Sequence, residues 1–131
     1  ITIFGGDQLR PNIHLKDMLR AYEAILEADV DKVNGEIFNA GWENKSVKDI
    51  ALTVKNILGE DIKLIVTPTN DNRSYHISSE KIKKVLNFST KFTIEDAVKD
   101  MKNAFTKQKL DDPLNNPNYF NIKKMQLIKL I

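Results

Sequence analysis

FGGDQLRPNIHLKD, residues 4–17, is the stretch that decides the fold of this chain. The apolar residues 1–4 that lead into it predict a strand, and its Gly-Gly-Asp sequence predicts a turn. From Leu15 onward apolar residues recur every three or four positions to about residue 28, which predicts a helix. A strand, a turn, a polar segment that contains Arg10 and a helix are therefore expected in this order.

Strands and helices continue to alternate along the rest of the chain. The expected elements are, in order, a strand over residues 35–40, a helix over 46–59, a strand over 62–66, helices over 79–86 and 93–105, a loop over 111–119 and a last helix over 122–128. Ser46 and Thr93 are expected N-caps, because each has an aspartate three positions further on. The alternation favours an α/β fold with a small mixed sheet and several packed helices.

The composition is that of a soluble globular protein, with 41% hydrophobic and 29% charged residues. The length of 131 residues suits a single domain, residues 1–131, or a piece of a larger protein. Because the chain opens on Ile1 inside an expected strand, and the expected sheet is thin, we expect it to be part of a larger α/β protein. The net charge of +2 indicates neither nucleic acid nor an anionic membrane as a partner, and no apolar run approaches the roughly 18 residues of a membrane helix.

Several kinds of chemistry are excluded or disfavoured by the residues present. The absence of cysteine excludes disulfides, a cysteine nucleophile and thiolate metal sites. His14 and His76 lie singly beside apolar residues, so we expect structural histidines and no metal site. Tyr119 and Lys123 match the Tyr-x-x-x-Lys pair of short-chain dehydrogenases, but in this lysine-rich chain, without a glycine-rich nucleotide motif, the match is attributed to chance. No catalytic residue and no cofactor site is therefore predicted within this chain.

The scarce arginines are the remaining candidates for a binding site. The chain has 17 lysines and only three arginines, so arginine is expected where its planar, forked group matters. Arg10 and Arg73 each lie in a polar loop that follows a predicted strand, where an arginine can bind phosphate with two hydrogen bonds or form a surface salt bridge of little energy. Arg20 lies in a helical pattern and is expected to be a solvated surface charge.

Three segments carry a resemblance to a known family. Residues 4–17 are similar to the G-x-Q-x-R-[DP]-x-I-H-V-x-D stretch of the extended short-chain dehydrogenase/reductase family, which contains the NAD-dependent nucleotide-sugar epimerases and dehydratases. GEIFNAG, residues 35–41, resembles the family's G-x-x-[YF]-N-[VI]-G strand, which a Ser-capped helix follows. DNRSY, residues 71–75, with Lys81 and Leu86 behind it, resembles the later D-x-R-x-Y segment and its helix. The three motifs stand in the family's order and cover about residues 1–105.

The resemblance implies a fold and a set of binding residues. It implies the C-terminal part of an extended Rossmann-type fold, whose missing N-terminal part binds NAD and holds the Tyr-Lys pair. By position, Arg10 and Arg73 would contact the diphosphate of a nucleotide sugar, and Asn44 would offer a weaker polar contact. His14 and Asp17 would orient the turn and cap the following helix. The additional arginine that many members carry before D-x-R-x-Y is absent here, where the chain has Thr-Pro-Thr at residues 67–69.

The resulting prediction is the C-terminal substrate-binding part of an NAD-dependent nucleotide-sugar epimerase or dehydratase. The parent enzyme is expected to be a cytoplasmic homo-oligomer without a metal, and the 131-residue chain alone is expected to be inactive. A different class of protein stays open, namely a free-standing α/β binding module without catalysis, for an anionic ligand or a partner protein. The sugar, the nucleotide base and the choice between epimerisation and dehydration do not follow from the residues.

Overall fold

The protein, as a computed structural model, is described over residues 1–71 and 73–130 and divides into two compact units, Ile1–Lys99 and Asp100–Ile131. The first unit contains β1 (Thr2–Phe4), β2 (Leu9–Asn12), α1 (Leu15–Leu26), α2 (Val30–Val33), β3 (Glu43–Ser46), α3 (Val47–Leu58), β4 (Ile65–Thr67), α4 (Glu80–Leu86) and the start of α5 (Ile94–Thr106). The second unit contains the rest of α5, the 3-10 helix η1 (Pro117–Tyr119) and α6 (Asn121–Leu127). The predicted α/β class with several packed helices is confirmed.

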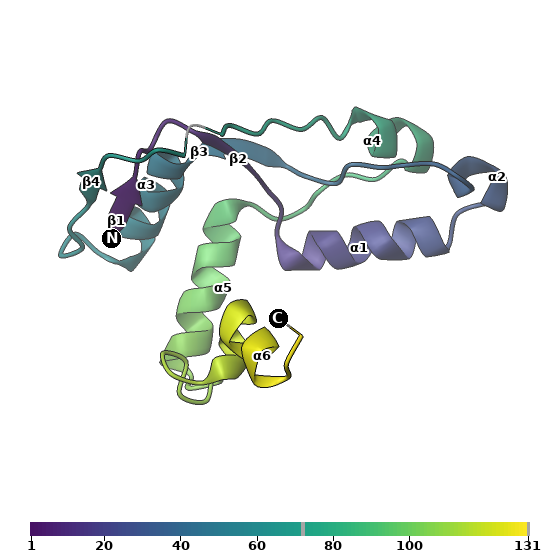
Figure 1. The fold of residues 1–131 in the computed structure, drawn as a ribbon. Coiled ribbons are helices and arrows are strands. Elements are labelled where there is room, and N and C mark those ends of the chain that lie inside the picture. Colours follow the sequence, from purple (N-terminus) through teal and green to yellow (C-terminus); the bar gives the residue numbers. More distant parts are fainter. Residues whose placement is uncertain (72, 131) are drawn as a thin grey trace. The chain divides into compact units, whose positions relative to one another are not determined.

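The strands of the first unit form two small sheets (Figure 1). β1 and β4 pair in parallel, with Ile3 opposite Val66, and α3 contacts β1. β2 and β3 pair antiparallel, with Arg10 opposite Lys45. The parallel and antiparallel pairing of the predicted mixed sheet is thus divided between two two-stranded sheets.

The starts of α1 and α3 are fixed by side chains that accept backbone N–H groups. His14 is the N-cap of α1, and its Nδ1 accepts from the N–H of Lys16 at 3.1 Å. Ser46 caps α3 as predicted, because its hydroxyl accepts from the N–H of Asp49 at 3.0 Å. Such contacts satisfy donors that the first turn of a helix leaves without an intrahelical partner.

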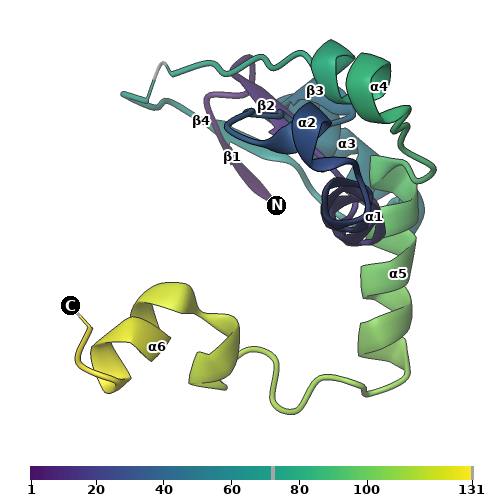
Figure 2. The same ribbon diagram turned by 90° about the vertical axis from the view of Figure 1, so that its right-hand side faces the viewer.

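The core of the first unit lies between α1 and α4. Ala21 on α1, Ile82 on α4 and Phe88 form a buried cluster, which Ala24, Phe38, Ala40 and Leu86 surround. Figure 2 shows α1 nearly end-on with α4 above it. This packing fixes the segments on either side of α4, and it therefore also fixes the path of the chain after β4.

The prediction of a strand over residues 35–40 is wrong. Within residues 1–71 and 73–130 this stretch pairs with no strand, Gly35 has a positive φ of 73°, and Phe38 and Ala40 pack instead against the cluster between α1 and α4. The strand forms later, at β3, from the polar sequence ENKS, because β2 supplies its hydrogen-bonding partner. Pairing with a distant segment here overrides the local preference for strand.

Other predicted boundaries also differ. β4 overlaps the strand predicted over residues 62–66 only at its C-terminal end, and β2 lies where the sequence predicted a polar loop. α1 buries only part of the predicted apolar face. Four of its six large apolar residues are more than half exposed, Met18 and Ile25 are partly buried, and its most buried residues are the small Ala21 and the charged Asp17. The exposed apolar residues of α1 are Leu15, Leu19, Tyr22 and Leu26.

The second unit is small and helical. The chain leaves α5 through Gln108, which has a φ of 51°, and the loop predicted over residues 111–119 contains η1 at its end. The side chain of Asn116 caps η1 by accepting from the N–H of Asn118 at 3.0 Å. η1 contacts α6, the predicted last helix.

Candidate functional site

The side chain of Gln8 bridges the turn after β1. The Oε1 of Gln8 accepts from the N–H of Gly6 at 2.6 Å, and its Nε2 donates to the carbonyl of Phe4 at 2.8 Å. Gly5 has a positive φ of 77°, and a Cβ there would lie 2.7 Å from Cγ2 of Thr69. A residue other than glycine would therefore disturb both the turn and the loop after β4.

A second segment runs beside β2 and brings the two candidate arginines together. The N–H of Leu9 donates to the hydroxyl of Ser74 at 2.9 Å, and the N–H of Tyr75 donates to the carbonyl of Leu9 at 3.0 Å. Arg10 and Arg73, 63 positions apart in the sequence, are thereby placed in direct contact. The sequence had singled out both residues but contained no local signal for their proximity.

Arg10 is held in place by neighbouring backbone and by an aromatic ring. Its Nη1 donates to the carbonyl of Leu9 at 2.9 Å and to the carbonyl of Arg73 at 2.7 Å. Its guanidinium carbon lies 5.4 Å from the centre of the Tyr75 ring, within range of a cation–π contact. The side chain is 30% exposed, so Arg10 is a fixed positive charge at an accessible surface.

Arg73 is far more exposed, at 72% of its side chain, and its fork is occupied by Asp71. Nε of Arg73 donates to Oδ1 of Asp71 at 2.8 Å, and Nη2 donates to Oδ2 at 2.8 Å. Nη2 of Arg10 lies 3.7 Å from the same Oδ2. The two arginines therefore meet at one carboxylate, and two positive charges and one negative charge leave this cluster with a net charge of +1.

The charges of this cluster are fixed at ordinary pH. Hydrogen bonds from the guanidinium and the backbone N–H of Arg73 hold the pKa of Asp71 well below its usual range, and the charge of Arg10 acts in the same direction. The Asp71 carboxylate in turn raises the pKa of Arg73. A hollow of about 470 Å³ adjoins the cluster, since Asp71 and Ser74 line it together with Gly5, Asp7, Gln8, Pro68 and Thr69.

Asn44 lies on β3 and is joined to the segment that carries Arg73. Its Nδ2 donates to the carbonyl of Ile77 at 3.0 Å, and its Oδ1 accepts from the N–H of Ile77 at 3.0 Å. The amide thus ties β3 to the chain that follows Tyr75. The contact between Asn44 and a ligand stays a prediction.

Asp17 and Arg20 have structural contacts that the sequence did not reveal. Asp17 is fully buried, and its carboxylate accepts from the N–H groups of Lys91 and Phe92 at 2.9 to 3.0 Å. Arg20, expected as a solvated charge, instead pairs with Asp17 at 2.5 Å and donates to the carbonyl of Ser89 at 3.0 Å. Both residues fasten α1 to the chain that leads to α5.

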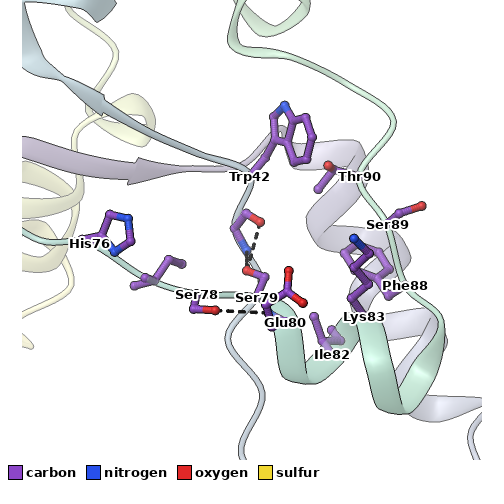
Figure 3. A pocket seen from close by; sticks show the side chains of 12 residues that line it. Trp42, His76, Ser78, Ser79, Glu80, Ile82, Lys83, Phe88, Ser89 and Thr90 are labelled. Atoms are coloured by element: carbon purple, nitrogen blue, oxygen red, sulfur yellow. Dashed lines mark hydrogen bonds between the residues drawn. The ribbon is translucent and has the colours of Figure 1, made fainter.

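A second hollow, of about 300 Å³, lies between residues 41–42 and the segment around α4 (Figure 3). Trp42, His76, Glu80 and Lys83 are among its lining residues, and none of the predicted site residues lines it. The hydroxyl of Thr90, at the same hollow, is buried without a hydrogen-bond partner among the described residues. Trp42 and Thr90 had no signal in the sequence, because isolated residues in loops give no spacing pattern.

Residues 1–71 and 73–130 contain no group of three or more histidine or acidic side chains that could hold a metal ion. None of their helices combines the length and the apolar character that crossing a bilayer requires.

Lys123, in the second unit, has its ammonium group 4.3 Å from the centre of the Phe120 ring.

Comparisons with known proteins give structural matches only. No protein-family model and no curated protein matches the sequence. The structure is similar to L-threonine dehydrogenase from Phytophthora infestans, with a TM-score of 0.70 and 17% identity over 84% of this chain and 37% of that chain. It is also similar to L-threonine dehydrogenase from Clostridium difficile, with a TM-score of 0.68 and 20% identity over 83% of this chain and 36% of that chain.

A third similar structure is UDP-glucuronic acid 4-epimerase from Bacillus cereus, solved in complex with UDP-glucuronic acid and NAD. The TM-score is 0.68, with 22% identity over 82% of this chain and 35% of that chain. The predicted fold, that of the C-terminal part of extended Rossmann-type dehydrogenases and epimerases, is confirmed. The chain spans only 35% to 37% of the length of these proteins.

Proposed function

We propose that this chain is the substrate-binding part of an NAD-dependent nucleotide-sugar epimerase or dehydratase. Arg10 and Arg73 contact the diphosphate of the substrate, and Asn44 offers a further polar contact. NAD and the catalytic Tyr-Lys pair belong to a part of the parent protein outside residues 1–131. The chain alone is then a binding unit without turnover, and the parent enzyme acts as a homo-oligomer.

One observation carries this proposal: two arginines from distant segments converge on a single anionic group. Guanidinium forks bind carboxylate and phosphate in the same two-bonded geometry. Arg10 is fixed by two carbonyls and a ring, so it loses little conformational freedom when an anion arrives. Arg73 is exposed and can follow a ligand into place.

The arginine pair of this chain suits the ligand of one kind of structural neighbour better than that of the other. The threonine dehydrogenases are named for an amino acid, whereas the epimerase was solved with a nucleotide sugar that carries a diphosphate. Two converging guanidinium groups favour the more highly charged ligand. We therefore place the substrate of the parent among the nucleotide sugars.

The proposal is tested by titrating the 131-residue chain with UDP, with L-threonine as the second ligand. The chain contains three arginines, so its arginine Nε–H groups give three signals in a ¹⁵N-correlated NMR spectrum. UDP is expected to shift the signals of Arg10 and Arg73 in a saturable way. The signal of Arg20 is an internal control, because that side chain is bound to the buried Asp17.

Arg73→Ala is expected to weaken UDP binding roughly tenfold to a hundredfold, the range for a hydrogen bond to a charged group. Arg73→Lys should recover only part of the loss, since it keeps the charge but not the fork. Lys32→Ala is the matched control, because Lys32 is also an exposed cation paired with an aspartate. Unchanged affinity in both Arg73 variants would remove this residue from the site, and a preference for L-threonine would refute the nucleotide-sugar assignment.

A further inference from the structure

The position that both guanidinium groups face is already occupied by a carboxylate of the chain itself. Oδ2 of Asp71 lies 2.8 Å from Nη2 of Arg73 and 3.7 Å from Nη2 of Arg10. A phosphate oxygen shared by both guanidinium groups would need this same position. The carboxylate also covers Nε and Nη2 of Arg73, the edge that best fits a second planar or tetrahedral anion.

Asp71 is hydrogen-bonded within its loop, and its carboxylate is partly exposed to solvent. Oδ1 accepts from the N–H of Arg73 at 3.1 Å, and the N–H of Asp71 donates to the hydroxyl of Thr69 at 3.1 Å. The side chain is nevertheless 37% exposed. Arg73 holds the pKa of the Asp71 carboxyl well below its usual range, so this side chain is an anion at neutral pH.

We propose that Asp71 is an internal competitor for the diphosphate, which must leave Arg73 before both arginines can contact the ligand. This inference rests on the proposed function and adds a regulating residue to the same site. The exchange asks little of the rest of the site, because Arg10 is bound by carbonyls and by Tyr75 rather than by Asp71 alone. Exposed ion pairs contribute little free energy, so a more highly charged ligand can replace the carboxylate.

Asp71→Asn is the variant that tests the competition. The asparagine Oδ1 can still accept from the backbone N–H of Arg73, so the loop contact is kept, but the charge and the two-bonded pair are lost. The probe is inorganic pyrophosphate, titrated into the metal-free chain in a calorimeter. We expect pyrophosphate to bind roughly three- to fivefold more tightly than in the wild type, which corresponds to losing a favourable exposed ion pair.

Asp7→Asn is the matched control for a general effect of charge. Asp7 lines the same hollow as Asp71, and its replacement removes one negative charge without removing a partner of either arginine. We expect less than a twofold change for this variant. The double variant Asp71→Asn/Arg73→Ala should gain less over Arg73→Ala than Asp71→Asn gains over the wild type, because Arg73 makes the closer contacts with Asp71.

The outcomes distinguish a failure of the Asp71 competition from a failure of the proposed diphosphate site. Tighter binding in Asp71→Asn, absent in Asp7→Asn and reduced without Arg73, supports the competition. Equal or weaker binding in Asp71→Asn, with Arg73→Ala still weakening the wild type, overturns it and makes Asp71 a residue that positions Arg73, while the proposed function stands. An equal gain in Asp7→Asn also overturns it. Absence of pyrophosphate binding in every variant overturns both the competition and the proposed diphosphate site.

Discussion

Asp17 illustrates how one buried charge can organise a small unit. Its carboxylate accepts backbone N–H groups of Lys91 and Phe92 and pairs with Arg20, and the Arg20 guanidinium lies 5.5 Å from the centre of the Phe88 ring. A buried carboxylate is stable only with such compensation. It joins α1 to the chain before α5, across 74 positions of sequence.

Asp17→Asn should therefore destabilise the first unit strongly. The amide keeps the size of the side chain but loses the charge that Arg20 faces, and its NH₂ group points a donor at other donors. Breaking a buried pair by changing one partner costs about 3–5 kcal/mol. The measurement is the free energy of unfolding from urea titration, with Glu23→Gln on the exposed side of α1 as control. Equal stability of both variants would mean that Asp17 is not a structural centre.

At the residue scale, the sequence could indicate which side chains matter but not what they touch. The scarcity of arginine correctly drew attention to Arg10 and Arg73, and Nη1 of Arg10 lies 2.7 Å from the carbonyl oxygen of Arg73. The same reasoning failed for Arg20, because its buried partner Asp17 was assigned to a capping role. The i, i+3 spacing of these two residues was the available signal.

Among the elements, α5 has the most explicit starting signal. Thr93 and Asp96 form a reciprocal pair: Oδ2 of Asp96 accepts from the N–H and from the hydroxyl of Thr93, each at 2.9 Å, and the hydroxyl of Thr93 accepts from the N–H of Asp96 at 3.2 Å. These hydrogen bonds from the Thr93 backbone and side chain lower the pKa of Asp96. Because this pKa is lowered in the folded state, the stability that the Thr93–Asp96 pair gives to the start of α5 depends on pH.

Asp96→Asn is expected to destabilise the chain at pH 6 and to have a smaller effect at pH 3. A carboxyl group with a depressed folded pKa stabilises the fold fully above its unfolded pKa, 3.8, and loses that contribution as the pH falls through the folded value. The free energies of unfolding of wild type and variant should therefore converge in acid. Asp61→Asn, in the exposed turn after α3, removes the same charge away from a helix start and serves as control. A difference that stays constant between pH 6 and pH 3 would contradict the linkage.

Helices were predicted better than strands because their signals are local. The cap at Ser46, the periodic apolar residues that follow and Gly59 at the end placed α3 within a residue of its observed bounds. β2 and β3 have the sequences LRPN and ENKS, which carry little preference for strand. They form because each supplies hydrogen-bonding groups to the other across more than 30 residues, and such pairing is invisible in a local window.

At the scale of the whole molecule, three weak motifs in a fixed order predicted the fold where no single one could. Their spacing placed a strand, a helix and a loop arginine in the order of a known architecture, and the structural matches bear out that architecture. Two of those motifs also contain the arginines that the structure brings together, Arg10 on β2 and Arg73 in the segment after β4. The division into two compact units had no signal in the composition.

The first unit leaves much apolar surface uncovered. Within the described residues, β1 and β4 pair only with each other, so each has an outer edge without a strand partner. On α1, Leu15, Leu19, Tyr22 and Leu26 follow a helical spacing and are all more than half exposed. Unpaired strand edges template further pairing, and exposed apolar patches of several hundred Å² are uncommon on monomers.

We therefore expect the 131-residue chain to self-associate in solution, through the exposed face of α1 or the edges of the β1–β4 sheet. Light scattering at two concentrations should give an average mass above 15.0 kDa that rises with concentration. Leu19→Lys should lower this mass, because a charge on the apolar face of α1 disfavours its burial. Leu114→Lys, also at an exposed leucine but outside the first unit, should leave it unchanged. A monomeric mass at both concentrations together with a cooperative melt would refute the prediction, because the exposed apolar face and the strand edges would then be tolerated by a self-sufficient monomer.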